Sequence, residues 1–423
     1  MRCLTGIFLE RLRGMCFGRF YRFFCALLFV VPLLADEPAT PAPLLLISLD
    51  GFRWDYCDLH PDETPNLRRL KTEGASARGL IPVFPSNTFP NHYSIATGLR
   101  PAHHGIINNN FFDPAAGRFF HYNQPACNHE ERWWGGEPVW ITAVRQGRAS
   151  ACSFWPGSET ELHGLRPTFW KPYDYSISFE RRLDELIGWL KLPVRQRPAV
   201  ITFYLEETNS VGHANGPESP ELAAAVKLLD TRVGAIIART EAESIPLNVV
   251  VVSDHGMTPL SADHVVVLDD YVDLANVQID FDGPVAGLRP LDGSVDELMQ
   301  KLVKLPSHAK AYRRQDLPPH LAITDNPRQP PVWILADEGW HVQKRSLLNA
   351  MRNHTMKGEH GYDPALPSMR GILIVHGPAF KTGGAIIDAV ENIHVYNLLC
   401  AAAGLQSAPN DGDDRLVHAL IAR

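Results

Sequence analysis

Acidic and histidine side chains gather in four short clusters along the chain. Three clusters come directly after stretches that read as buried strands, and the fourth lies in a glycine-rich segment. The residues are Asp50, Asn209 with His213, Asp254 with His255, and His360. Carboxylate and imidazole groups form a typical zinc ligand set. Two such ions about 3.5–4 Å apart can clamp a phosphoryl group and activate an attacking oxygen, so the clusters indicate phosphoryl-transfer chemistry.

Thr88 is the candidate for the attacking oxygen. It lies in the stretch P-S-N-T-F-P-N-H-Y-S-I-A-T-G, where Pro90 suits the first turn of a helix and Gly98 suits its end. We therefore expect Thr88 at or just before a helix N-terminus. The free N–H groups and the positive dipole end make such a position a good seat for an anion, and a metal ion would activate the hydroxyl.

Each of these positions also has a plainer interpretation. A Thr flanked by prolines is usually a turn residue, and Asp50 can simply cap a turn. The Asn108–Asn110 trio is typical of a turn, although an Asn amide can also donate to an oxyanion. One cluster would be weak evidence, and the occurrence of four clusters together favours a site.

The elements that must position these side chains are strands buried on both faces. Nearly continuous apolar runs suit such strands at 44–49, 199–205, 248–252 and 371–375. Helix signals lie between and after them, at 64–74, 178–192, from 219 onward and at 394–404. This alternation predicts an α/β fold with a mainly parallel central sheet flanked by helices. In such folds the carboxyl ends of the strands carry the site.

Two regions interrupt the alternation. Residues 118–168 are rich in Trp, Gly and Pro with little periodicity, so we predict a long irregular excursion, and such loops are often functional. Residues 258–353 mix short apolar pieces with Pro and Gly, and we predict a smaller inserted subdomain there. The main domain is thus expected to run over 44–423 with this insertion.

Residues 1–35 read as a signal peptide. Several arginines precede an apolar run at 23–35 that is too short to span a bilayer comfortably, and a Pro/Ala linker follows at 36–43. A start at Met15 would give a more typical leader, and an uncleaved anchor is the alternative. We expect export to the periplasm or the extracellular space, with membrane contact only through the leader if it stays uncleaved.

Charge and cysteine content restrict the function further. The chain has 423 residues and a net charge of −7 without a basic run in its body, which argues against a dedicated nucleic-acid surface but not against a small nucleotide substrate. After the leader, four cysteines remain and none form a C-x-x-C pair, so a structural cysteine–zinc site is not expected. We predict a disulfide between Cys127 and Cys152, which both lie in the irregular excursion of an exported chain.

Eight segments occur in order between Leu44 and the C-terminus. They are L-I-S-L-D-G-F, P-S-N-T-F-P-N-H-Y-S-I-A-T-G, H-G-I-I-N-N-N, W-W-G-G-E-P-V-W, F-W-P-G-S-E, E-E-T-N-S-V-G-H, V-S-D-H-G-M and G-E-H-G-Y-D. In order and spacing they resemble the nucleotide pyrophosphatase/phosphodiesterase family of the alkaline phosphatase superfamily. The resemblance implies an alkaline phosphatase-like fold.

The resemblance also implies a role for each matching residue. Thr88 would be the nucleophile that becomes phosphorylated, and Asn109 would donate its amide to a phosphoryl oxygen. Two zinc ions are implied, one held by Asp50, Thr88, Asp254 and His255, the other by Asn209, His213 and His360. Phe89 and Tyr173 match the aromatics that sandwich a nucleotide base, and Tyr204 matches a further pocket position.

The chain departs from the family pattern at one ligand, because the family has Asp where this chain has Asn209. An amide oxygen is neutral and a weaker zinc ligand than a carboxylate, so the second ion is expected to bind more weakly. Glu206 or Glu207 is a possible source of the missing charge, and the strand pattern does not say which of them faces inward.

The function expected from the resemblance is a secreted zinc-dependent phosphodiesterase or nucleotide pyrophosphatase with a phospho-threonine intermediate. Within the same fold, a lysophospholipid or choline-ester phosphodiesterase is the alternative. A sulfatase is not expected, because T-F-P-N-H lacks the C/S-x-P-x-R setting. A non-catalytic nucleotide-binding relative, decayed at Asn209, is the alternative from another class, and the retained Thr88 argues against it.

Overall fold

The computed structural model describes residues 41–348 and 356–422. The expected signal peptide and residues 36–40 of the expected linker lie outside the described residues. Over the ranges described, no helix combines the length and the apolar character needed to cross a membrane.

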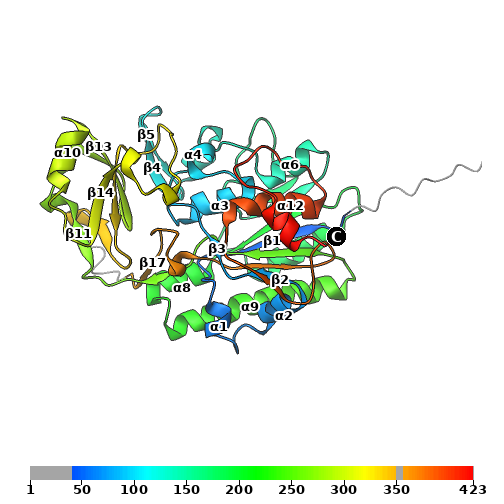
Figure 1. Cartoon of the computed structure of the whole chain (residues 1–423). Coiled ribbons are helices and arrows are strands. Elements are labelled where there is room, and N and C mark those ends of the chain that lie inside the picture. Colours follow the sequence, from blue (N-terminus) through cyan, green and yellow to red (C-terminus); the bar gives the residue numbers. More distant parts are fainter. Residues whose placement is uncertain (1–40, 349–355, 423) are drawn as a thin grey trace, which may run out of the picture. The chain divides into compact units, whose positions relative to one another are not determined.

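An eight-stranded sheet lies at the centre of the fold (Figure 1), with the strand order β19-β2-β18-β9-β1-β8-β6-β7. Strands β9, β1, β8, β6 and β7 run parallel to one another, whereas β18 is antiparallel to both of its neighbours. The predicted α/β fold with a mainly parallel sheet is therefore confirmed, with one antiparallel strand within it. The bounds are β1 (Leu44–Leu49), β2 (Ala75–Ala77), β6 (Ser150–Ser153), β7 (Phe169–Lys171), β8 (Val200–Leu205), β9 (Asn248–Val252), β18 (Leu373–His376) and β19 (Ala385–Ile387).

Helices cover both faces of this sheet. In Figure 1, α2 (Pro65–Glu73) and α9 (Pro220–Ala242) lie below it, and α3 (Thr88–Thr97) and α12 (Val395–Ala403) lie above it. Alternate residues of β1 belong to two separate apolar cores, because Leu45, Ile47 and Leu49 pack with α2, α9 and α7 (Phe179–Leu190). Leu44 and Leu46 pack instead with α3, α12 and α6 (Val139–Arg145). This two-sided burial is why β1 carries no polar alternation.

The helix ends follow the sequence signals. Ser178 accepts a hydrogen bond from the backbone N–H of Arg181 at the start of α7, and Ser219 accepts one from Leu222 at the start of α9, where Pro220 is the first helical residue. Helix α3 ends at Gly98, which has a φ of 69°. These capping interactions fix where each helix begins and ends relative to the sheet.

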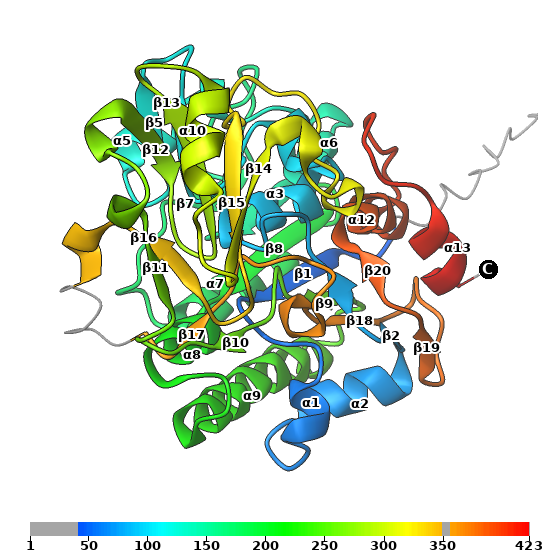
Figure 2. The ribbon, with the colours of Figure 1, turned by 60° about the vertical axis from the view of Figure 1, so that its left-hand side comes forward.

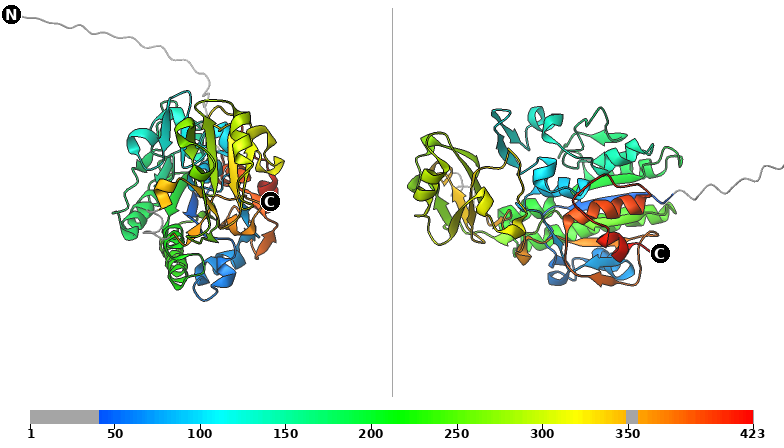
Figure 3. Two further views of the ribbon diagram at one scale, coloured as in Figure 1. Left: turned by 90° about the vertical axis from the view of Figure 1, so that its left-hand side faces the viewer. Right: turned by 45° about the horizontal axis from the view of Figure 1, so that its top comes forward.

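A second, four-stranded antiparallel sheet has the order β12-β13-β15-β14. Its strands are β12 (Val277–Phe281), β13 (Val285–Pro290), β14 (Ala309–Arg313) and β15 (Val332–Ala336), and α10 (Val295–Leu302) packs with it around its own apolar core. Figure 1 and the right-hand view of Figure 3 show these strands to one side of the main sheet, and Figure 2 turns them toward the viewer. Trp333 joins the two parts, because its ring centroid lies 5.5 Å from that of Phe84.

Shorter elements complete the described chain. Four two-stranded ladders are β3 (Leu80–Ile81) with β20 (Val390–Glu391), β4 (Asn110–Asp113) with β5 (Arg118–His121), β10 (Thr258–Pro259) with β17 (Gly358–Glu359), and β11 (Val265–Val267) with β16 (His341–Gln343). The remaining α-helices with described bounds are α1 (Tyr56–Leu59), α4 (Pro101–His104), α5 (Pro125–Asn128), α8 (Glu207–Asn215) and α13 (Arg415–Leu420).

The prediction of an irregular excursion over 118–168 is wrong in part. The region contains β5, α5, α6 and β6, which is a strand of the main sheet, and its last part, residues 154–168, has neither helix nor strand. The signals are weak because α6 and β6 are short, and because all of β6 and the first five residues of α6 are buried and show no polar face.

The predicted disulfide between Cys127 and Cys152 is also wrong. Both are buried free thiols, as are Cys57 and Cys400. Cys152 lies inside β6, and the Cys127 thiol donates to the carbonyl of Phe119 at 3.4 Å. Both cysteines belong to the same apolar core as unbridged thiols, and the spacing in sequence carried no information about this.

Candidate active site

The first set of clustered ligand groups lies past the carboxyl ends of two central strands. Asp50 follows β1, and Asp254 and His255 follow β9, its neighbour in the sheet. Nε2 of His255 lies 3.4 Å from Oδ1 of Asp50 and 3.1 Å from Oδ2 of Asp254. All three side chains are fully buried, so the parallel strands bring the predicted residues together as expected.

Thr88 lies beside this set. It is the first residue of α3, and its Oγ1 lies 3.3 Å from Nε2 of His255. The positive end of the α3 dipole therefore lies beside the Thr88 hydroxyl. One turn later on α3, Nδ1 of His92 lies 2.9 Å from the Thr88 carbonyl and 3.2 Å from Oδ2 of Asp254.

The second set comes from α8 and from β17. The segment after β8 forms the helix α8, which places Asn209 and His213 one turn apart on one side. His360 follows β17 directly, and its ring centroid lies 5.0 Å from that of His213. It also lies 3.5 Å from that of His255, so the two sets adjoin.

Gly51 allows α8 to approach β1 this closely. Its φ is +66°, and an added Cβ would lie 3.0 Å from Cα of Asn209. The hydroxyl of Thr208 donates to the carbonyl of Asp50 at 2.5 Å and fixes the same contact. A side chain at Gly51 would therefore push the two ligand sets apart.

Three imidazoles are oriented in the same way. Nδ1 of His213, His255 and His360 is held by the backbone carbonyls of Gly358 (2.9 Å), Gly256 (2.8 Å) and Ser86 (2.9 Å), respectively. A carbonyl accepts, so each Nδ1 carries the proton and each Nε2 is left as a lone-pair donor. Metal-binding histidines are typically fixed by such outer hydrogen bonds.

The ionisation of the buried groups suits a cation. Burial and the neighbouring carboxylate of Asp254 raise the pKa of Asp50 well above its usual range. Burial also acts to raise the pKa of Asp254, but nearby imidazoles, His255 first, outweigh it and hold that pKa below its ordinary value. Burial, helped by neighbouring imidazoles, lowers the pKa of His360, and burial lowers that of His255. Neutral imidazoles beside crowded carboxylates are what a metal ion requires of its ligands.

Unpartnered atoms test whether these residues fit metal ions. Oδ1 of Asp50, Oδ1 of Asn209 and Oδ2 of Asp254 are buried, and none has a hydrogen-bond partner in the described parts of the chain. Ligand atoms of Asp50, Asp254 and His255 lie within 4.8 Å of one another, as do those of His213, Glu359 and His360. Buried polar atoms are normally satisfied, so oxygens left open beside open Nε2 atoms fit two metal-binding groups.

A cavity of about 520 Å³ opens onto both sets. Asp50, Thr88, Asn209, His213 and His360 form one end of its lining, and the predicted pocket residues Phe89, Asn109, Tyr173 and Tyr204 also line it. Residues of the 118–168 region, such as Tyr122 and Glu159, contribute a wall that the sequence did not indicate residue by residue.

The predicted pocket residues differ in how they are held. Oδ1 of Asn109 accepts from the backbone N–H of Phe89 at 2.8 Å, which leaves the amide nitrogen for a ligand. The Phe89 ring packs against Tyr122, with centroids 5.4 Å apart. Tyr173 is 48% exposed. The hydroxyl of Tyr204 donates to Oδ2 of Asp50 at 2.5 Å, so this residue also orients a ligand carboxylate.

Glu359 and His92 contact the ligand residues of the site, and the sequence analysis did not predict either of them. Both stand within segments that the sequence singles out, Glu359 directly before His360 and His92 four residues after Thr88. A second carboxylate or imidazole inside a motif was the available signal. Burial acts to raise the pKa of Glu359, but the imidazole of His213 and its neighbours outweigh burial and hold that pKa well below its usual range.

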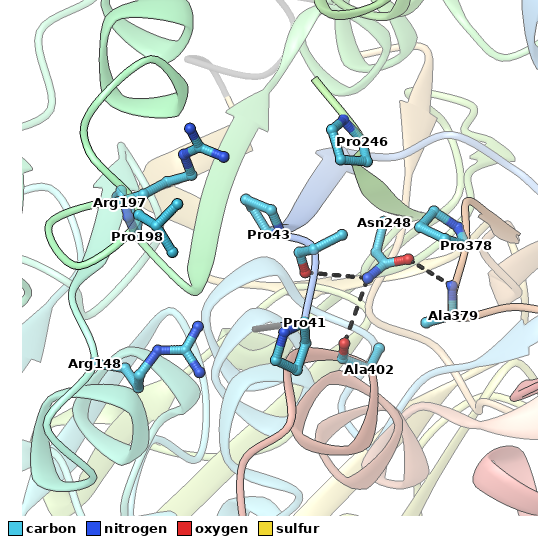
Figure 4. Close-up of a pocket in the computed structure, with 12 residues that line it drawn as sticks. Pro41, Pro43, Arg148, Arg197, Pro198, Pro246, Asn248, Pro378, Ala379 and Ala402 are labelled. Carbon is cyan, nitrogen blue, oxygen red and sulfur yellow. Dashed lines mark hydrogen bonds between the residues drawn. The ribbon is translucent and has the colours of Figure 1, made fainter. Parts of the chain in front are cut away.

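A second cavity, of about 420 Å³, lies where the central strands begin (Figure 4) and is lined mainly by prolines and two arginines. The Asn248 amide nitrogen donates to the carbonyls of Ala42 (3.2 Å) and Ala402 (3.4 Å), and its oxygen accepts from the N–H of Ala379 (2.8 Å). These bonds tie the segment before β1 to α12, which is a structural role. None of the predicted site residues lies here.

Comparison with known proteins identifies the class. Residues 44–363 match the family model of type I phosphodiesterase / nucleotide pyrophosphatase. The chain therefore belongs to this family, and the fold is that of the alkaline phosphatase superfamily, as the motifs indicated.

Individual relatives extend over most of the chain. It is 37% identical over 391 residues to a venom phosphodiesterase of Macrovipera lebetinus, covering 90% of this chain and 45% of that protein. It is also 37% identical over 381 residues to an uncharacterized pyrophosphatase/phosphodiesterase of Schizosaccharomyces pombe, covering 87% of this chain and 78% of that protein. The chain thus spans about half the length of the venom enzyme and most of the yeast protein.

Solved structures agree with this placement. Murine ectonucleotide pyrophosphatase/phosphodiesterase 5 superimposes with a TM-score of 0.84 at 32% identity, covering 90% of this chain and 100% of that chain. An inactive threonine-to-alanine variant of the murine protein in complex with AMP gives the same score.

Proposed function

We propose that this chain hydrolyses phosphodiester or pyrophosphate bonds of nucleotides through a phospho-threonine intermediate. The observation that carries the proposal is the position of Thr88. It is the first residue of α3, it lines the 520 Å³ cavity, and its hydroxyl oxygen lies 3.3 Å from Nε2 of His255. The names of the relatives and the inactive threonine variant of the murine protein support it.

Two zinc ions are the proposed cofactors. Asp50, Asp254, His255 and Thr88 would hold one ion, and Asn209, His213 and His360 would hold the other. When bound, zinc lowers the pKa of a coordinated hydroxyl and neutralises negative charge on phosphoryl oxygens. Carboxylate oxygens with imidazole nitrogens are the donor set that zinc accepts.

The protein's own groups account for the remaining steps. The Thr88 oxygen attacks phosphorus, and the bond to the alcohol or phosphate leaving group breaks. The amide nitrogen of Asn109, whose Oδ1 accepts from the N–H of Phe89, donates to a phosphoryl oxygen and stabilises the charge that develops there. Water then attacks the phosphothreonine and releases the product together with free Thr88.

The aromatic end of the cavity favours a nucleotide substrate. Phe89 and Tyr173 both line it, and each offers a ring face or edge to a planar base. The complex of the murine protein with AMP supports this choice. A lysophospholipid or choline ester is the alternative substrate class of the same site, because the same aromatic wall would tolerate an alkyl chain or a quaternary ammonium group.

Export and domain organisation are also proposed. The leader-like residues 1–35 and the venom relatives support a periplasmic or extracellular protein. The separate apolar core around β12–β15 supports an inserted subdomain within 258–353 of a domain that runs over 44–423. Sequencing the N-terminus of the exported protein tests the first point, because cleavage would leave a chain beginning near residue 36.

A substrate panel with metal analysis tests the function. The purified chain is assayed with a nitrophenyl nucleotide diester, a nucleotide pyrophosphate, a lysophospholipid and a phosphocholine ester, with and without added zinc. Zinc-dependent turnover of the nucleotides is the expected result. Preferential turnover of the choline substrates would favour the alternative, and nucleotide binding without turnover would indicate a non-catalytic relative.

A further inference from the structure

The second ligand set lacks a charged ligand where the first set has two. Asn209 is neutral, and His213 and His360 are imidazoles whose Nδ1 atoms are already donating to carbonyls. A divalent ion at this set would meet one amide oxygen and two neutral nitrogens. Such a site gains no direct attraction between opposite charges from its first ligands.

The two glutamates next to Asn209 in sequence do not correct this. Glu207 forms an ion pair with Arg232 of α9, and among the described residues it belongs to neither group of clustered ligand atoms. Glu206 precedes α8, and among the described residues it belongs to neither group of clustered ligand atoms. The missing charge must come from another part of the chain.

Glu359 is placed to supply it. This carboxylate is 8% exposed and lies on β17, directly before His360. Its Oε1 accepts from the backbone N–H of His360 at 2.9 Å and lies 3.8 Å from Nδ1 of His213. Its Oε2 lies 3.0 Å from Nε2 of the buried His341. The carboxylate therefore lies on the Nδ1 side of His213, behind the Nε2 atom that the site presents.

We propose that Glu359 is a positioning residue that restores the charge lost at Asn209, acting on the second ion from behind His213 and His360. The inference rests on the proposed two-ion site. A buried carboxylate in contact with both histidine segments raises their affinity for a cation through a field that buried surroundings screen little, and it fixes the geometry of β17. The negative charge near the second ion therefore comes from a residue that contacts the ligands, and not from a ligand itself.

Zinc counting without substrate tests the proposal. Wild-type protein, Glu359→Gln and the matched control Glu207→Gln are loaded with zinc and dialysed against buffers of decreasing free zinc, and bound zinc per chain is measured. Glu359→Gln keeps the side-chain shape and an oxygen for the His360 N–H. We expect its second ion to be lost at free zinc about tenfold or more above the wild-type value, with the first ion and the control unchanged.

A rescue separates charge from structure. In the double variant Asn209→Asp/Glu359→Gln, a carboxylate returns as a ligand, so zinc retention should recover to the wild-type value or above it. In the wild-type background, Asn209→Asp should increase zinc retention less than it does in the Glu359→Gln background, because two carboxylates beside one ion repel each other. Thermal unfolding in excess zinc checks that each variant is folded.

Defined outcomes overturn the inference. Retention of both ions by Glu359→Gln at the wild-type free zinc would remove the role of Glu359, and a loss that Asn209→Asp fails to rescue would make that role structural only. Turnover of the nitrophenyl nucleotide diester by wild-type protein in saturating zinc is measured separately. If that turnover is present while the zinc curves coincide, the inference fails and the proposed function stands. If turnover is absent, the proposed function fails whatever the zinc curves show.

Discussion

Thr88 combines three features of an activated nucleophile. Its side chain is at the start of a ten-residue helix, it lies 3.3 Å from Nε2 of His255, and it faces a cavity large enough for a nucleotide. The hydroxyl makes no hydrogen bond that holds the fold together apart from this contact, in the parts that the structure describes. Its removal should therefore affect chemistry much more than stability.

Thr88→Ala should lower kcat/KM for nucleotide diesters by about three orders of magnitude or more, because the covalent route is lost. Zinc content and the thermal unfolding midpoint should stay close to wild type. Steady-state kinetics with metal analysis on the same samples checks both points. Near-normal turnover in the variant would rule out the phospho-threonine route.

Tyr173 is the residue at which substrate recognition can be separated from chemistry. It is half exposed, and its ring contacts Phe154 edge-on at 5.3 Å, so its truncation should not disturb the core. Because base–aromatic stacking contributes about 1–3 kcal/mol per base, Tyr173→Ala should raise KM for a nucleotide diester roughly tenfold. A nitrophenyl diester without a base is the control substrate, and an equal loss on it would contradict the stacking role.

The residues of the site could be named from the sequence, but their partners could not. Asp50, Asp254 and His255 follow apolar strands, and this placement alone predicts that they meet at one edge of the sheet. Glu359 was overlooked because the direction of its side chain depends on the pairing of β17 with β10, which is a contact between segments about 100 residues apart. Local pattern does not encode such a pairing.

At the scale of elements, burial decides what the sequence reveals. Strands β1, β8 and β9 are buried on both faces, so their apolar runs are visible, and α7 and α9 have capping residues. Helix α8 was not predicted, because its nine residues E-T-N-S-V-G-H-A-N have little helical pattern and are held by packing on α9 and β17. The direction of β18 could not be predicted either, since it depends on the path of the preceding chain.

The small antiparallel sheet contains a buried carboxylate that makes its stability depend on pH. Asp280 of β12 lies 2.7 Å from Nε of Arg289, but its Oδ1 has no hydrogen-bond partner in the described chain. Burial outweighs the attraction of Arg289 and raises the pKa of Asp280 to about 7. A raised folded-state pKa means that this group contributes stability below its unfolded pKa, near 4, and loses that contribution as the pH rises through about 7.

Asp280→Asn, which cannot ionise, should remove this dependence. As the pH rises from 4 to 8, the wild type should lose about 2–4 kcal/mol of unfolding free energy relative to the variant. Thermal unfolding of both proteins in equal zinc across this range checks the shift and cancels titration at the metal ligands. A constant difference between the two proteins would mean that Asp280 titrates normally.

At the scale of the whole described chain, bound cations should act as a source of stability. Asp50 and Asp254 are fully buried carboxylates in contact with the same imidazole, and burial together with the charge of Asp254 raises the pKa of Asp50, so a bound cation would relieve this strain on the Asp50 carboxylate. A ligand present at about 100 times its dissociation constant stabilises the folded state by about 2.7 kcal/mol.

Dialysis against a strong chelator should therefore lower the thermal unfolding midpoint, and added zinc should restore it. Calorimetry before and after chelation measures the change. A protein that carries Asp50→Asn and Asp254→Asn together should show a smaller difference between the two conditions, because it has lost the first set of ligands. An unchanged midpoint in the wild type would argue against resident metal.

The ladder between β10 and β17 pairs Thr258 with Glu359 and Pro259 with Gly358. Thr258 comes shortly after Asp254 and His255, and Glu359 comes directly before His360, so this short ribbon helps to set the spacing of the two ligand sets. The residues between Pro259 and Gly358 leave and return at neighbouring points. The length and sequence of this segment can therefore change in evolution while the distance between the two strands of the ribbon stays the same.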